Sequence, residues 1–352
     1  MASVVFMGTP DFAAGILRSL IESEYEVKAV FTQPDRPKGR KGILQMPPVK
    51  ELALRSEIPV YQPEKIRFTE NVQILKDLQP DMIVVAAFGQ IIPQSILDIP
   101  RFGCLNVHAS LLPAWRGAAP IQWSILAGDQ VTGVTIMRMD AGLDTGDMIL
   151  KKEVAIREDE TGDSLFDVLM EEGARALLEA MEQVFSGSAV YTPQSKESPT
   201  PYAKMLSRQS GLIDWTMDAE QIARMVRAYY SWPGTYTFLH SKMLKILKAA
   251  ALPETENDAG MATETVKASV LPESEKDAGM ITEETASQTA ARKAAPGEIL
   301  LERRDELLVG TGRGVLRVLE VQPEGKKRMD VAAYLRGSHL TKGERFSDRR
   351  EE

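Results

Sequence analysis

The sequence predicts an α/β fold, with a doubly wound, mostly parallel sheet followed by a small all-β domain. Two observations support this prediction. In the first half of the 352-residue chain, short apolar runs alternate with amphipathic helical stretches, which is the pattern of consecutive βαβ units. In the second half, short apolar runs are separated by Gly and Pro turns, which is typical of a small barrel or a sandwich. A chain of this length can form two domains, each with its own core.

The first domain is expected at residues 1–185. Residues 3–7 and 27–31 are apolar runs that flank a helical stretch at 11–23, as expected for buried parallel strands joined by a helix. The closing helix at 163–185 has its apolar residues at roughly helical spacing. In chain order, the further elements expected between them are a helix at 69–78, strands at 82–88 and 104–107, and a strand pair at 133–139 and 148–154.

A linker and a smaller domain follow. Residues 186–210 begin with a stretch rich in Ser, Pro and Thr, so we interpret this segment as a linker. The second domain is expected at 211–345, and the pattern of its strands does not distinguish a barrel from a sandwich. Its predicted elements are a helix at 218–230 and strands at 235–239, 243–247, 306–310 and 315–321.

An acidic insert at 251–295 interrupts this second domain. The run from Leu252 to Met261 is echoed from Leu271 to Met280, at an offset of 19 residues. Residues 251–291 carry nine acidic and two basic side chains and no aromatic one, so we expect disorder rather than a packed core. We interpret the segment as a tandem duplication within a surface loop; an acidic partner-binding segment is the alternative.

The composition indicates a cytoplasmic protein. Hydrophobic residues make up 43% of the chain and charged residues 26%, but no apolar run approaches the roughly 20 residues that cross a bilayer. The N-terminus lacks the basic and long apolar regions of a signal peptide. Cys104 is the only cysteine, so no disulfide can form within the chain, and a reducing setting is expected. We also expect a monomer that does not bind membranes.

The net charge of −8 is unevenly distributed along the chain. The acidic insert carries most of the excess negative charge, whereas residues 33–50 and 292–345 each carry a net charge of +4. Because phosphates interact with local patches and not with total charge, the net charge does not exclude a nucleic-acid partner.

Two short motifs predict an acyl-transfer site. Asn106 and His108 are two residues apart, so on a strand they point to the same face, and a later Asp-rich loop carries Asp144. An amide can donate to a developing oxyanion, an imidazole can move a proton, and a carboxylate can orient the imidazole. The alternative is structural: a hydrogen-bonded core histidine, a turn-forming Asn and a loop-capping Asp.

Other chemistries have little support. The turn from Gly8 to Asp11 lacks the further glycines of a dinucleotide site, and no Lys follows to complete a phosphate loop. There is no nucleophile elbow. Three scattered histidines and one cysteine make no zinc site, so no metal is expected.

Several segments resemble folate-dependent formyltransferases. They are NVHASLLPAWRGAAPIQ at 106–122 and MDAGLDTGDM at 139–148. The segments VVFMGTPDFA at 4–13 and FTQPDRPKGR at 31–40 narrow the resemblance to members that formylate the methionine of initiator tRNA. The resemblance implies 10-formyltetrahydrofolate as the donor, initiator methionyl-tRNA as the acceptor, and an oligonucleotide-binding-like (OB-like) barrel as the second domain. It also places the family's catalytic Asn, His and Asp on Asn106, His108 and Asp144.

The same resemblance implies two further sets of site residues. The folate-binding set is Phe88, Gly89, Gln90, Ile91, Ser110, Leu111, Leu112, Pro113 and Asp140. The tRNA-binding set is Arg36, Lys38, Arg40 and Lys41 in a flexible loop, with Lys204, Arg208, Lys326, Lys327 and Arg328 as further candidates. For both sets the alternative is an ordinary loop, packed on the core or solvated by its charges.

Three other functions would account for part of the sequence. A sugar-nucleotide N-formyltransferase shares the folate half and the catalytic trio, but it has no need of the basic loop. A glycinamide ribonucleotide transformylase resembles the first domain alone. A non-enzymatic RNA-binding protein would not need Asn106, His108 and Asp144 together.

Overall fold

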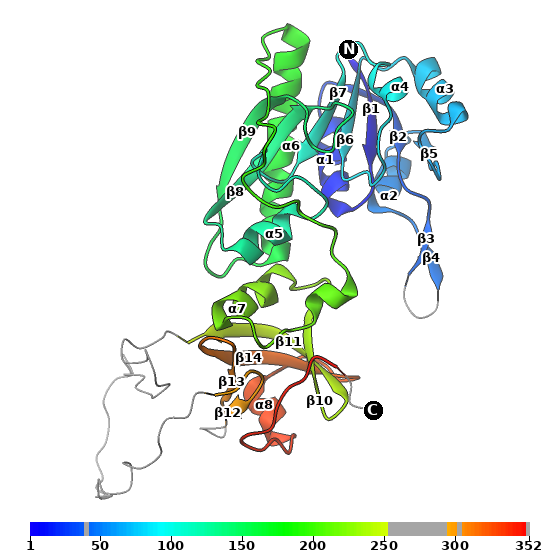
Figure 1. Ribbon diagram of the computed structural model, residues 1–352. Helices are drawn as coiled ribbons and strands as arrows, with labels where there is room; N and C mark the ends of the chain where they lie inside the picture. Colours follow the sequence, from blue (N-terminus) through cyan, green and yellow to red (C-terminus); the bar gives the residue numbers. More distant parts are fainter. Residues whose placement is uncertain (39–41, 253–293, 301–304, 350–352) are drawn as a thin grey trace, which may run out of the picture. The chain divides into compact units, whose positions relative to one another are not determined.

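The computed structural model describes residues 1–38, 42–252, 294–300 and 305–349. These residues form two compact units, Met1–Ser207 and Arg208–Glu352 (Figure 1). The predicted linker at 186–210 therefore lies within the first unit as far as Ser207, and its last three residues lie in the second unit. The predicted acidic insert falls almost entirely outside the described residues, as do Arg40 and Lys41.

A seven-stranded sheet forms the centre of the first unit, in the order β5-β2-β1-β6-β7-β8-β9. The first five strands are parallel, and β8 and β9 extend the sheet in antiparallel pairing. The order reverses between β1 and β6, which confirms the predicted doubly wound, mostly parallel sheet. The strands are β1 Ser3–Gly8, β2 Glu26–Phe31, β5 Val60–Tyr61, β6 Met82–Ala86, β7 Cys104–His108, β8 Val131–Arg138 and β9 Met148–Ala155.

Helices cover both faces of this sheet (Figure 1). On one face α1 and α6 pack together, with the rings of Phe12 and Phe166 in edge contact at 5.6 Å. On the other face, residues of α3 and α4 share a buried cluster with alternate residues of β6. The helices are α1 Asp11–Ile21, α2 Pro48–Arg55, α3 Thr69–Leu78, α4 Gln94–Leu97, α5 Pro120–Ala127 and α6 Gly162–Ser186.

The boundaries of α6 follow from its sequence. The Thr161 side chain accepts a hydrogen bond from the Ser164 nitrogen, and the Ser164 hydroxyl accepts one from the Thr161 nitrogen, which forms a capping box. Gly187 ends the helix with a positive φ of 76°, a conformation that glycine adopts without steric cost.

The second unit is an antiparallel sheet of six strands, ordered β10-β11-β14-β13-β12 with β15 paired to β14. The segment around Phe346 bonds to both edges of this sheet, because Ser347 pairs with Phe238 of β10 and Arg345 with Glu298 next to β12. This closure matches the barrel that the resemblance implies. The elements are α7 Ala219–Ala228, β10 Thr235–Leu239, β11 Lys242–Ala251, β12 Ile299–Leu300, β13 Leu307–Gly310, β14 Val315–Pro323, β15 Met329–Asp330, α8 Val331–Arg336 and a 3-10 turn at Arg208–Gly211.

Short elements were not predicted from the sequence. Among them are α2, α5 and a hairpin of two strands, β3 Arg36–Lys38 and β4 Ile43–Gln45. Across the described residues, no helix combines the length and the apolar character that crossing a membrane requires.

Candidate active site

Strand β7 places Asn106 and His108 on one face of the sheet. Between them, Val107 points to the opposite face, where its side chain lies close to Gly173 of α6. Because successive side chains of a strand alternate, Asn106 and His108 face away from α6. Both are largely buried, with 9% and 6% of their surface exposed. The structure therefore brings the first two members of the predicted trio together.

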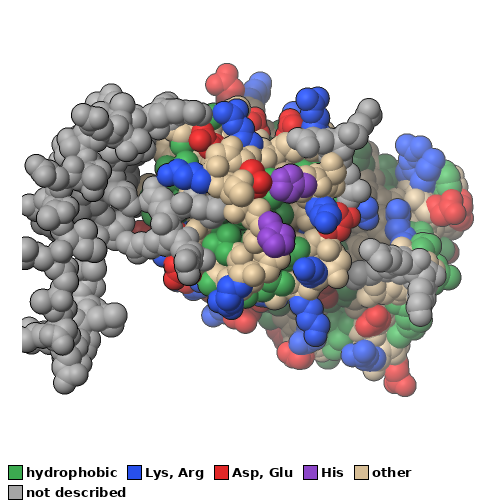
Figure 2. Space-filling model, turned by 90° about the horizontal axis from the view of Figure 1, so that it is seen from below, with side chains coloured by type: hydrophobic (Ala, Val, Ile, Leu, Met, Phe, Trp, Pro, Cys, Tyr) green, Lys and Arg blue, Asp and Glu red, His purple; other side chains and the backbone are tan. Residues whose placement is uncertain are grey.

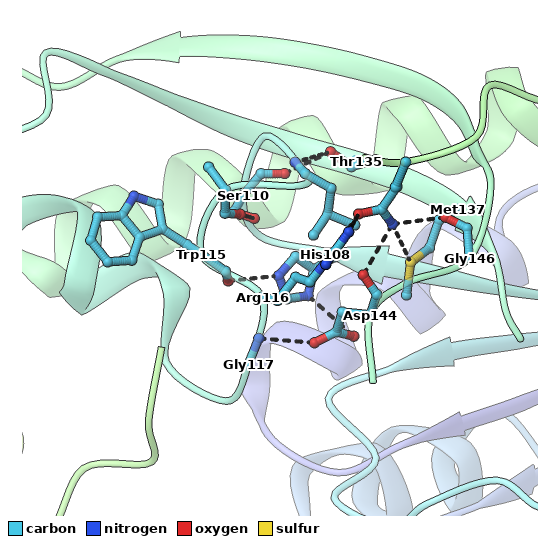
Figure 3. A network of polar contacts seen from close by, with 12 residues as sticks. His108, Ser110, Trp115, Arg116, Gly117, Thr135, Met137, Asp144 and Gly146 are labelled. Carbon is cyan, nitrogen blue, oxygen red and sulfur yellow. Dashed lines mark hydrogen bonds and ion pairs between the residues drawn. The ribbon is translucent and has the colours of Figure 1, made fainter. Parts of the chain in front are cut away.

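The His108 imidazole lies between a carbonyl and a carboxylate (Figure 3). Its Nε2 atom is 3.1 Å from the carbonyl oxygen of Trp115, and its Nδ1 atom is 3.8 Å from Oδ1 of Asp144. A carbonyl oxygen only accepts hydrogen bonds, so Nε2 carries a hydrogen in this arrangement. In the neutral ring, Nδ1 is then the nitrogen with a free lone pair, on the side of Asp144.

Asp144 is held by the loop opposite. Its Oδ2 atom accepts a 2.9 Å hydrogen bond from the backbone nitrogen of Gly117. Asp144 itself has a positive φ of 54°, in the loop that joins β8 and β9. Nearby, Gly146 leaves no room for a side chain, because a Cβ there would lie 1.8 Å from the carbonyl oxygen of Arg138. Asp140 stabilises the same loop by accepting from Thr145 at 2.8 Å.

Asn106 pairs with Val85 of β6 on one side and with Met137 of β8 on the other. No other residue in the described part of the chain hydrogen-bonds to its side-chain amide. The amide hydrogens are therefore free to bind a substrate oxygen beside His108.

A compact turn follows β7 and carries the Trp115 carbonyl. The Ser110 hydroxyl donates to the carbonyl oxygen of Ala114 at 2.7 Å. The Thr135 hydroxyl of β8 donates to the Ser110 carbonyl at 2.7 Å and accepts from the Leu112 nitrogen at 3.0 Å. The indole nitrogen of Trp115 donates to Asp129 at 2.6 Å. This turn fixes the direction of the carbonyl that binds His108.

Residues 192–203, hereafter the strap, pass over this turn and over the Asp144 loop. The Gln194 side chain contacts both, and Ala203 pairs with the backbone on either side of Gly117. The Thr200 hydroxyl accepts from the Trp115 nitrogen at 2.6 Å. Sequence analysis missed these residues, because an irregular segment held by side chains leaves no periodic pattern.

Cys104 is buried in the same strand, two residues before Asn106. Burial is the main cause that raises the pKa of its thiol to about 12. Because the thiolate is the nucleophilic form, Cys104 is suited to packing and not to covalent chemistry near neutral pH. Within the part of the chain that the structure describes, no cluster of three or more potential metal-binding side chains is found.

The predicted folate-binding residues lie in three segments that flank Asn106 and His108. The side chain of Phe88 belongs to the core, and its carbonyl accepts from Thr9 and Gln33. Gln90 bonds to the backbone of Pro63 and Ile66, whereas Ile91 is 72% exposed. In the other two segments, Ser110 and Leu112 are buried, Leu111 and Pro113 are half-buried, and Asp140 is exposed.

The predicted tRNA-binding residues lie in both units. Arg36 and Lys38 belong to β3 of the hairpin, whose base is anchored by Asp35. Hydrogen bonds from Lys50, and then from Gln62, hold the pKa of Asp35 below its usual range. The remaining described candidates, Lys204, Arg208, Lys326, Lys327 and Arg328, are exposed.

The basic side chains of the second unit are not all equivalent. Arg328 bonds to both carboxylate oxygens of Glu320, at 2.5 and 2.8 Å, whereas Lys326 and Lys327 lie on an exposed turn after β14. On the face shown in Figure 2, Lys and Arg side chains are interspersed with acidic and apolar ones and do not form one dense patch.

Comparison with known proteins identifies the family of this chain. The sequence pattern of the family described as formyl transferase matches residues 1–181, and that of the formyl transferase C-terminal domain matches residues 205–339. The chain belongs to the formyl transferase family. Methionyl-tRNA formyltransferase of Agathobacter rectalis is 45% identical to this formyltransferase, over 98% of this chain and 99% of the relative. The enzyme of the same name from Geobacter sulfurreducens is 44% identical, over 98% of this chain and 96% of the relative.

Solved structures share the fold of this formyltransferase. WlaRD, a sugar 3N-formyl transferase, aligns with a TM-score of 0.60 at 16% identity, over 93% of this chain and 99% of that chain. HypX from Aquifex aeolicus, in complex with tetrahydrofolic acid, aligns with a TM-score of 0.55 at 19% identity, over 94% of this chain and 46% of that chain.

Proposed function

We propose that this formyltransferase transfers a formyl group from 10-formyltetrahydrofolate to the α-amino group of methionyl initiator tRNA. The observation that carries this proposal is its identity of 44–45% to two enzymes named methionyl-tRNA formyltransferase, over almost the whole of each chain. The arrangement of Asn106, His108 and Asp144 supports it, because formyl transfer needs an oxyanion donor and a proton acceptor side by side.

Asn106 stabilises the charge that develops during transfer. The amine attacks the formyl carbon, a new C–N bond forms, and the formyl oxygen becomes an oxyanion. The free side-chain amide of Asn106 donates to this oxygen. Collapse of the tetrahedral species then breaks the bond between the formyl carbon and N10 of the folate, so the formyl group stays on the amine.

His108 moves the proton that this exchange requires. Its Nε2 atom is hydrogen-bonded to the Trp115 carbonyl. The Nδ1 atom therefore takes the proton that the attacking amine loses. The charge then lies 3.8 Å from the Asp144 carboxylate, which stabilises it. The same proton passes to the departing N10 atom, and the enzyme returns to its starting state.

The residues around the trio suit a flat, partly apolar donor. Ile91 follows β6 and Leu143 precedes Asp144, and both are large apolar side chains with most of their surface exposed. Covering two such side chains is favourable for a pterin ring. Since the Phe88 side chain is buried in the core, we infer that this part of the loop contributes its backbone.

Three groups of basic side chains are available for tRNA phosphates. One is on the β3–β4 hairpin, where Arg36 is exposed, and another comprises the exposed residues Lys204 and Arg208, which are close in sequence. The third is the exposed pair Lys326 and Lys327. Arg328 is already paired with Glu320, so we expect it to contribute less than the two lysines.

A competition assay tests the proposed acceptor. The enzyme is given 10-formyltetrahydrofolate with methionyl initiator tRNA or with an amino-sugar nucleotide, and kcat/KM is measured for each. The proposal expects a preference of at least about 10³-fold for the tRNA, the range in which a required set of contacts discriminates. Equal values, or a preference for the sugar nucleotide, would overturn it.

A further inference from the structure

The strap lies between the two regions that match the family patterns, 1–181 and 205–339. It nevertheless contacts both the turn whose Trp115 carbonyl binds His108 and the loop that carries Asp144. Ser198 donates to the carbonyl of Pro113 at 2.8 Å, and Thr200 accepts from the Trp115 nitrogen. Gln194 is the residue of the strap whose side chain reaches the backbone of Asp144 itself.

The carboxamide of Gln194 both donates and accepts hydrogen bonds. Its Nε2 atom donates to the carbonyl oxygens of Asp144, at 3.0 Å, and Gly146, at 2.7 Å. Its Oε1 atom accepts from Nε and Nη2 of Arg116, at 3.1 and 2.8 Å. Arg116 is further held by the carbonyl oxygens of Ser195 and Lys196, at 2.8 and 3.4 Å. One side chain thus ties the loop of Asp144 to the residue that precedes Gly117.

These contacts hold Asp144 at two points, its carboxylate and its backbone carbonyl. Gly117 holds Oδ2 of Asp144, and Gln194 holds the backbone carbonyl of Asp144. With both in place, Oδ1 is directed toward Nδ1 of His108. Loss of the Gln194 amide frees two carbonyl oxygens on a loop whose Asp144 already adopts a positive φ. We expect the loop of such a variant to relax away from His108.

We propose that Gln194 is a positioning residue for formyl transfer, which acts through Asp144 and not by touching substrate. The proposal rests on the proposed function, because it assigns Gln194 a part in the same reaction. A displacement of about 1 Å in a catalytic group is enough to cost on the order of 100-fold in rate. We therefore expect Gln194→Ala to lower kcat about 10- to 100-fold, with KM for donor and acceptor changed less than about threefold.

A double-mutant cycle separates this role from general support of the fold. The kcat values of wild type, Gln194→Ala, Asp144→Asn and the double variant are compared. If Gln194 acts only through the Asp144 carboxylate, Gln194→Ala has little further effect once that carboxylate is gone. A purely structural role predicts the same loss in both backgrounds, so additive effects would overturn the proposal.

Gln194→Glu distinguishes the two halves of the contact. A carboxylate still accepts from Arg116 but donates nothing to the carbonyls of Asp144 and Gly146. We expect this variant to remain as impaired as Gln194→Ala; recovery to the wild-type rate would assign the effect to Arg116 and overturn the proposal. The matched control is Glu197→Gln, an exposed side chain on the same strap, which should leave kcat unchanged.

A failure of the proposed function can be distinguished from a failure of the proposal for Gln194. Formylation of methionyl-tRNA by the wild-type enzyme tests the acceptor, whereas the cycle can be measured with any acceptor amine that the enzyme formylates. Thermal melting of each variant completes the test. A drop in Tm large enough to unfold Gln194→Ala at the assay temperature would show that Gln194 is structural.

Discussion

The backbone nitrogen of Gly117 donates a 2.9 Å hydrogen bond to Oδ2 of Asp144, although the two residues lie in different loops. This contact occupies one carboxylate oxygen and leaves the other on the side of His108. A hydrogen bond to an ionised acceptor is stronger than one between neutral groups. The position of Asp144 is therefore set partly by a residue that has no side chain.

Gly117→Ala should lower both activity and stability. The φ of Gly117 is 127°, which alanine rarely adopts, and a Cβ there would lie 2.6 Å from the carbonyl oxygen of Ala203. We expect at least a 10-fold loss of kcat and a clear drop in Tm. The control is Gly187→Ala, also at positive φ but with no atom within 4 Å of the added Cβ. It should cost about 1 kcal/mol and leave kcat intact. Wild-type kcat in Gly117→Ala would contradict the role of this contact.

Removing any member of the trio should slow the chemical step. Asn106→Ala, His108→Ala and Asp144→Asn are each expected to reduce kcat by roughly 10²- to 10³-fold, which is typical of removing one preorganised transition-state contact. Single-turnover rates with saturating substrates measure this step. His240→Asn replaces an exposed histidine of the second unit and serves as the control. A trio variant with near-wild-type single-turnover rate would show that the residue has another role.

The Cys104 thiol should be inert in the native enzyme. Its pKa is raised from about 9 to about 12, mainly by burial, so the folded state keeps a proton that the unfolded state loses above pH 9. Stability should then fall as pH rises from about 9 toward 12, because the unfolded state binds fewer protons in this window. Urea unfolding between pH 8.5 and 11 should show a steeper loss for wild type than for Cys104→Ala. Labelling of the native thiol by a disulfide reagent at pH 8 would contradict this burial.

Neutralising the basic segment 36–41 should weaken use of tRNA more than binding of the donor. With Arg36, Lys38, Arg40 and Lys41 replaced by Gln, kcat/KM for methionyl-tRNA should fall, and its dependence on salt should become shallower by about one unit of log–log slope per lost phosphate contact. The Kd of the folate should stay within about twofold. The control is the double variant Lys76→Gln, Arg175→Gln. Both side chains are exposed, and they lie on helices α3 and α6. An unchanged salt slope would exclude the segment 36–41 as a phosphate-binding element.

The longer elements of the fold follow closely from the sequence. The predicted helix at 69–78 coincides with α3. The predicted strand at 133–139 overlaps β8 but extends one residue past its end, and the predicted strand at 148–154 lies within β9. These segments are long enough for their apolar residues to show a period. Elements such as β5, with two residues, and α2, with eight, are too short for a period to stand out.

The catalytic side chains of the candidate site could be predicted, because they lie in recognisable sequence motifs. The two-residue spacing of Asn106 and His108 places them on one face, and the Asp144 loop lies beside them in the structure. The contacts that position them were not predictable. Trp115 and Gly117 act through backbone atoms, and Gln194 acts on backbone atoms, so none of the three leaves a chemical signature in the sequence.

The strap has a consequence for how the enzyme is made. Translation proceeds at about 5 to 20 residues per second, so Asn106, His108 and Asp144 emerge from the ribosome some seconds before Gln194, Thr200 and Ala203. Over that interval the nascent chain holds the whole catalytic trio without the backbone contacts of the strap. All contacts of the strap with the site can therefore form only after Ala203 has been synthesised, shortly before the second unit begins.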